Sequence, residues 1–119
     1  MLELSVDAEN ILCGSRSTTG TILTVPAGMQ WSGDILLTAS VAVAGTSAPQ
    51  VTTSGTNAVP ASGSIVHRLS VTGLALTTVV DSATLEVIVR APEGNDITLE
   101  FTSGASGTST VTANGFLAP

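Results

Sequence analysis

The side chains that could perform chemistry are few in this chain. It holds one histidine, His67, and one cysteine, Cys13, and it has neither lysine nor tyrosine. His67 lies in phase with Ile65 and Leu69, so it falls on the apolar face of an alternating segment. It could act as a ligand or a general base, but we favour a core or interface histidine whose ring nitrogens meet backbone groups. A Cys13–His67 pair would lack the third group that orients the base of a nucleophilic dyad.

Cys13 has no partner for a disulfide within the chain, because it is the only cysteine. That suits either a reducing compartment or a protein that is indifferent to redox conditions. A reactive thiol would need a basic neighbour, and Arg16 is close in sequence. We favour the alternative of a buried structural cysteine, since free cysteine is among the most buried residue types.

Two short acidic segments, Asp7 to Asn10 and Glu93 to Asp96, could in principle bind calcium. Calcium needs several oxygen ligands converging on one loop. Neither segment has the ligand spacing of an EF-hand or of a repeated calcium-binding motif. Because candidate bases and nucleophiles are also so few, the sequence predicts a protein that is not an enzyme and has no metal site and no cofactor.

The charge balance is acidic. Nine Asp and Glu residues against three Arg residues give a formal net charge of −6. A nucleic-acid partner needs clustered basic residues, and an anionic membrane surface needs the same, so both are disfavoured. The first residues carry acids where a secretion signal would carry Lys or Arg, and no apolar run approaches the roughly 20 residues that span a bilayer. We therefore expect synthesis in the cytoplasm.

Alternation of apolar and polar residues with a period of two dominates the chain, and no long segment shows a helical period. The alternating segments are 2–6, 21–25, 35–43, 65–71, 85–89, 97–101 and 109–113. Val, Ile and Thr, which favour strands, are abundant. The sequence predicts a single all-β domain over residues 1–119, an antiparallel β-sandwich or jelly-roll-like fold of about seven or eight strands.

Proline and glycine mark the turns between these segments. Residues 25–28 (Val-Pro-Ala-Gly) and 91–94 (Ala-Pro-Glu-Gly) each predict a tight corner between two strands. Small polar residues dominate 44–64, which predicts a long surface loop with a short strand at 50–53. Residues 10–20 and 103–107 predict shorter loops. The apolar stretch 74–80 predicts either one helical turn or a connection.

Several apolar residues fall on strand faces that are otherwise polar. Such two-faced strands, together with a charged content of only 10%, favour a face covered by another protein. Trp31 is open to two interpretations, a cap on the core or an exposed anchor. The candidate interface residues are Leu2, Leu4, Val6, Trp31, Leu36, Val66 and Ile88.

Three features carry a family resemblance. They are a composition rich in Thr, Ser, Ala and Gly, the run TILTVPAGMQWSGD from Thr21 to Asp34, and the ending TANGFL from Thr112 to Leu117. On these features the chain resembles virion proteins of tailed bacteriophages, most closely the small capsid decoration proteins, also called cement or head-stabilising proteins. The resemblance implies binding to the major capsid protein on the outside of an assembled head. It also implies a homo-oligomer, with a trimer favoured, that braces the shell against internal DNA pressure.

The leading hypothesis is thus a non-enzymatic virion structural protein, made in the host cytoplasm and located on the capsid exterior. We expect the N-terminal segment 1–10, or the loop 44–64, to contact the capsid or sister subunits. The alternative is a receptor-binding or tail-fibre-type adhesion module, which would expose Trp31 to glycans or a cell surface.

Overall fold

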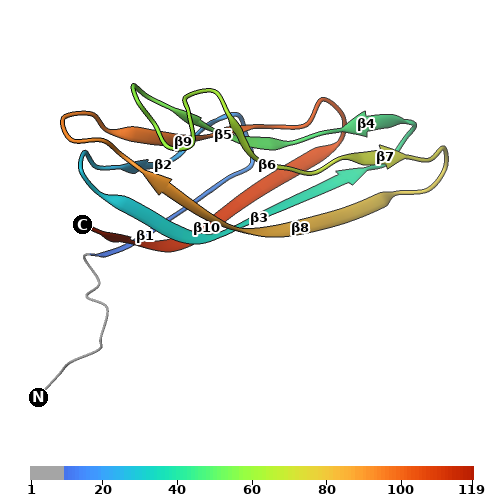
Figure 1. The fold of residues 1–119 in the computed structure, drawn as a ribbon. Helices are drawn as coiled ribbons and strands as arrows, with labels where there is room; N and C mark the ends of the chain where they lie inside the picture. Colours follow the sequence, from blue (N-terminus) through green and yellow to red (C-terminus); the bar gives the residue numbers. More distant parts are fainter. Residues whose placement is uncertain (1–9) are drawn as a thin grey trace, which may run out of the picture.

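The computed structural model describes residues 10–119, which form two antiparallel four-stranded sheets packed face to face (Figure 1). The first, sheet A, has the order β1-β10-β3-β8, and the second, sheet B, has the order β2-β9-β5-β6. A two-stranded ribbon, β4-β7, continues the sandwich at one end. The ten strands are β1 (Ile11–Arg16), β2 (Gly20–Val25), β3 (Gln30–Val41), β4 (Gly45–Ser47), β5 (Gln50–Ser54), β6 (Ile65–Arg68), β7 (Val71–Gly73), β8 (Val79–Arg90), β9 (Ile97–Thr102) and β10 (Thr108–Ala118).

The strands pair as one long antiparallel hairpin whose tip is the segment 55–64. Moving outward from that tip, β5 pairs with β6, β4 with β7, β3 with β8, β2 with β9 and β1 with β10. Two further pairings, β10 with β3 and β9 with β5, close the rolled hairpin into the two sheets. Such a rolled arrangement is a jelly roll, and it confirms the predicted all-β sandwich.

The core lies between the two sheets and is built from the inward residue of each alternating pair. On β3, the residues at 35, 37, 39 and 41 are all buried, and on β9 the residues at 97, 99 and 101 are buried. These are the phases that the alternation predicts. The largest fully buried side chains are Trp31, Phe101, Ile35, Leu37, Ile97 and Leu99.

Trp31, near the start of β3, packs against the inner side of sheet A. Its side chain is fully buried, and its indole Nε1 donates a hydrogen bond of 2.9 Å to the backbone carbonyl of Leu12. Gly33 and Gly115 are paired across β3 and β10 directly beside it. A Cβ added at Gly115 would lie 2.7 Å from Trp31 Cζ2, so the two glycines provide the space that the indole occupies.

The prediction of a loop over residues 10–20 is wrong for 11–16, which form the edge strand β1. The inward positions of this strand are Leu12, Gly14 and Arg16, so no apolar alternation reveals it. Gly14 is required because a Cβ there would collide with the backbone carbonyl of Ile22 on β2. Arg16 instead organises the following turn, donating to the carbonyl oxygens of Thr18 (2.9 Å) and Thr21 (3.2 Å).

The predicted long loop 44–64 contains more regular structure than the sequence indicates. β4 and β5 occupy much of it, and the predicted short strand at 50–53 is confirmed as β5. The longest part without a strand is 55–64, and it is held in place at Thr53, whose buried hydroxyl donates to the carbonyl of Ala61 (2.8 Å). Of the stretch 74–80, residues 74–77 form a tight turn and residues 79–80 already belong to β8, so this stretch is a connection and not a helical turn.

Three apolar residues expected on inward faces are exposed: Val43, Ile65 and Leu85. Val43 lies beyond the end of β3. Ile65 lies beside a register shift between Val51 and Thr52, which breaks the alternation of its strand. Leu85 lies in β8, which has 12 residues, whereas the edge strand of the opposite sheet, β6, has four and leaves part of β8 uncovered.

We predict that Gly115→Ala lowers the free energy of unfolding by about 1–3 kcal/mol, because the added methyl collides with the Trp31 indole and with the backbone of Ser32. Urea denaturation followed by circular dichroism measures the change. Thr108→Ala, at an exposed position of the same strand, is the control and should change stability by less than about 0.5 kcal/mol. Equal stability of the two variants would contradict this account of the glycine.

Candidate interaction surface

His67 makes a structural contact across the sandwich. Its side chain is buried on β6, and its Nε2 lies 3.1 Å from the backbone carbonyl of Ala83 on β8. A carbonyl only accepts, so Nε2 carries the hydrogen and donates it. The contact joins the edge strand of sheet B to the edge strand of sheet A, which agrees with the interpretation of His67 as a core histidine bonded to backbone.

The expectation that Cys13 is buried is wrong, because its side chain is exposed on β1. The alternation of this strand places Leu12 and Gly14 inward and Cys13 outward. β1 and β6 also end the strand orders of their sheets on opposite sides of the sandwich, so Cys13 and His67 do not meet. The two residues do not form a nucleophilic pair in this fold.

The acidic segment 93–96 forms the corner between β8 and β9. Asp96 uses Oδ1 to accept a 2.9 Å hydrogen bond from the backbone N–H of Ala27, which ties this corner to the β2–β3 corner. Across residues 10–119, no three His, Cys, Asp or Glu side chains come together as a metal site would require. Asp7 and Glu9, from the other acidic segment, lie outside the described residues.

The structure separates the candidate interface residues. Leu36 and Ile88 are exposed and point outward from sheet A. Trp31 is fully buried, so the packing alternative describes it and no partner can reach its side chain in this fold. Val66 is only half-buried and packs against the core. Leu2, Leu4 and Val6 lie outside the described residues.

The solvent side of sheet A, called the outer face below, brings Leu36 and Ile88 into one surface. Its side chains form rows across the strands, because residues directly opposite each other in neighbouring strands share a face. The rows, read from β1 through β10 and β3 to β8, are Ile11–Phe116–Ser32–Ile88, Cys13–Asn114–Asp34–Glu86 and Ser15–Thr112–Leu36–Thr84. Three more rows lack β1: Thr110–Thr38–Ser82, Thr108–Ser40–Val80 and, at the other end beyond the Phe116 row, Ala118–Gln30–Arg90.

Most of the outer face is uncharged. The three rows that contain Thr112, Thr110 and Thr108 hold hydroxyl side chains together with Leu36 and Val80, and they carry no formal charge. The Thr38 and Thr110 hydroxyls are hydrogen-bonded to each other across β3 and β10. Five of the exposed large apolar residues lie on this face, namely Ile11, Leu36, Val80, Ile88 and Phe116.

Ile11 and Phe116 are the members of this surface that the sequence reasoning missed. β10 runs on to Ala118, five residues past the end of the predicted segment 109–113. Continuing the alternation of that segment would have placed Phe116 opposite in phase to Val111 and Ala113, and therefore outward. Ile11 could not be placed because its strand, β1, was not predicted.

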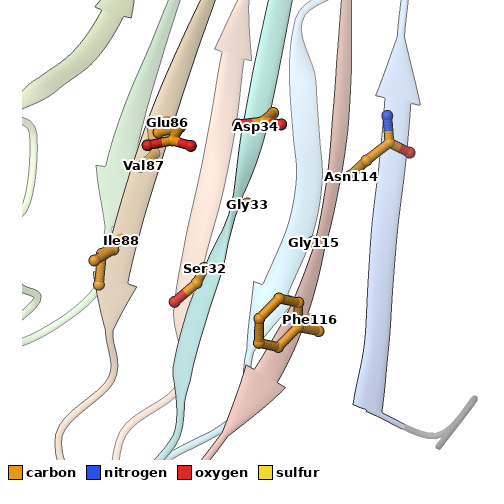
Figure 2. A pocket seen from close by; sticks show the side chains of 9 residues that line it. All are labelled: Ser32, Gly33, Asp34, Glu86, Val87, Ile88, Asn114, Gly115 and Phe116. Atoms are coloured by element: carbon orange, nitrogen blue, oxygen red, sulfur yellow. The ribbon is translucent and has the colours of Figure 1, made fainter. Parts of the chain in front are cut away.

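A groove of about 510 Å³ crosses the outer face between its first two rows. Figure 2 shows Phe116, Ser32 and Ile88 along one side of it and Asn114, Asp34 and Glu86 along the other. The paired glycines Gly33 and Gly115 contribute to its floor and add no side chain there. One bank of the groove is therefore mainly apolar and the opposite bank is acidic.

Asp34 and Glu86 are directly opposite each other in β3 and β8. Arg90 exchanges both of its backbone hydrogen bonds with Val59, outside the β3–β8 ladder. The backbone N–H and C=O of every second residue in a strand point to the same side, so those of Ile88 and Glu86 also point away from β3. Asp34 and Glu86 are therefore a non-hydrogen-bonded pair, whose Cα atoms are typically about 4.5 Å apart. Like charges directly opposite each other in neighbouring strands are destabilising.

No family model matches the chain, and no curated protein matches it either. Among the described residues there is no helix long and apolar enough to cross a membrane. What the chain binds is therefore inferred from the fold and from the chemistry of its outer face.

We predict that His67→Ala lowers the free energy of unfolding by about 1–3 kcal/mol, because it removes a buried side chain and the hydrogen bond to Ala83. Arg68→Ala is the matched control: Arg68 is the next residue, and its exposed side chain donates to the Gln50 side chain across the strand pair. Urea midpoints compared with wild type measure both effects. A stability loss in the Arg68 variant as large as that in the His67 variant would contradict the role given to His67.

We also predict that acrylamide quenches the fluorescence of Trp31 weakly in the folded protein and strongly after unfolding, because the indole has no exposed surface. Trp31 is the only tryptophan, so the signal reports this one residue. Strong quenching of the folded protein would return Trp31 to the candidate anchors and revive the adhesion alternative.

Proposed function

We propose that the chain is a non-enzymatic virion structural protein that binds the outside of a phage capsid and stabilises the shell. The major capsid protein is its partner, and the outer face of sheet A is the surface that meets it. The resemblance to decoration proteins supplies the partner, and the chemistry of the outer face supplies the contact surface. The same resemblance favours a homo-oligomer, with three subunits as the expected number.

The uncharged part of the outer face is the observation that carries the proposal. In a chain with a net charge of −6, nine neighbouring outward positions on β10, β3 and β8 hold seven hydroxyl side chains and two apolar ones. Interface cores are depleted of Asp, Glu and Lys, because burying an unpaired charge costs free energy. Hydroxyls both donate and accept, so they find partners on an opposing backbone surface.

The fold and the overall charge are consistent with the same role. Jelly rolls occur in viral capsid and lectin domains among others, although a fold alone does not define a function. An acidic domain is repelled by packaged DNA, which favours a position on the outside of the shell. Both observations support the proposal without identifying the docking site on the capsid.

Purified protein mixed with undecorated heads of the phage that encodes it should bind saturably, at a fixed number of copies per capsomer. Thr110→Lys should weaken this binding at least about tenfold, because it places a charge in the middle of the contact surface. Thr24→Lys puts the same charge on an exposed position of sheet B and should bind as wild type does. Co-sedimentation with quantitative gel analysis measures occupancy.

Two results would contradict the proposal. Absence of saturable binding by the wild-type protein would remove the capsid as partner. Loss of binding in the Thr24 variant, with retention in the Thr110 variant, would remove the outer face of sheet A as the contact surface.

A further inference from the structure

We propose that the groove on the outer face receives a basic side chain, arginine or lysine, presented by a protein partner. Its aliphatic stem lies along Phe116 and Ile88, and its cationic end lies between Asp34 and Glu86. The identity of the partner as a capsid protein rests on the proposed function. The chemistry of the occupant rests on the groove alone.

The apolar bank suits the stem of a long basic side chain. Phe116 and Ile88 are 46% and 61% exposed, and the small Ser32 between them leaves both side chains accessible from the groove. Lysine and arginine bury their methylene stems along apolar surface while keeping the charged end in a polar environment. The ring of Phe116 adds a favourable face for a nearby cation.

The acidic bank suits the cationic end. The carboxylates of Asp34 and Glu86 come from facing strands at one edge of the groove, and Asn114 extends this bank on β10 (Figure 2). A guanidinium matches two carboxylates well because its donors form a planar fork. A cation between the pair would also relieve the repulsion between the two like charges.

The arginines of the chain do not supply that cation. Arg16 donates its hydrogen bonds to the turn at 18–21, and Arg68 donates to Gln50 in sheet B. Arg90 is on β8 opposite Gln30, beyond Ile88 on the apolar side of the groove. Within residues 10–119 the pair therefore depends on solvent or on another molecule for a counter-charge.

Other occupants fit less well. Nucleic acid and other polyanions are repelled by the acidic bank. Calcium takes six to eight oxygen ligands, and two carboxylates with one amide leave most of that shell to water. Neither occupant makes use of Phe116 and Ile88, whereas a basic side chain uses both banks at once.

The test is a titration of the ¹⁵N-labelled full chain with the peptide acetyl-Arg-Ala-Arg-amide, followed by backbone amide shifts. Saturable shifts are expected at residues 33–34, 86–88 and 114–116. The double variant Asp34→Asn/Glu86→Gln keeps the size of both side chains and should bind at least about tenfold more weakly. Glu93→Gln removes a charge from an exposed corner and should bind as wild type does.

Several results would overturn the inference. One is an absence of shifts in the groove. Another is equal shifts with acetyl-Gln-Ala-Gln-amide, and a third is unchanged binding by the double variant. Shifts produced by millimolar calcium chloride but not by the arginine peptide would also overturn it, in favour of a cation site.

Head binding separates this inference from the proposed function. If wild type decorates heads and the double variant decorates them equally well, the groove is not the contact and the inference fails, while the proposed function stands. If the peptide binds the groove but wild type does not bind heads, the proposed function fails, and the preference of the groove for a basic side chain stands.

Discussion

The pairing of β3 along both of its edges is the constraint on which the rest of the molecule depends. Its twelve residues face β8 on one side, and eleven of them face β10 on the other. This pairing draws residues 30–41, 79–90 and 108–118 into one sheet although they are far apart in the chain. It fixes the inward residues as the core and, by the same alternation, fixes the outward residues as the candidate binding surface.

The inner and outer sides of sheet A are linked at its two paired glycines. On the inner side, Gly33 and Gly115 make room for the buried indole of Trp31. On the outer side, the same residues add no side chain to the floor of the groove between Phe116 and Asp34. A side chain at either position would point inward against Trp31, so the two glycines serve the core packing, while their backbone contributes to the floor of the groove.

The sequence was sufficient to predict the all-β class and the burial of most strand residues, because a period of two states directly which side chains share a face. It did not reveal β1, where Gly14 and Arg16 interrupt the apolar alternation for reasons that arise from contacts with β2 and the next turn. Nor could periodicity say which strands pair. Leu36 and Ile88 were predicted to be outward, but their place beside Phe116 follows only from the order β10-β3-β8.

The central claim is that the outer face of sheet A is the surface that meets a partner. The most direct measurement is a cryo-electron microscopy reconstruction of decorated heads at a resolution that orients the sandwich. The account predicts that the outer face lies against the capsid protein, with a basic side chain of that protein in the groove beside Asp34 and Glu86. A reconstruction in which this face points to solvent, and sheet B or the 55–64 tip makes the contact, would contradict it.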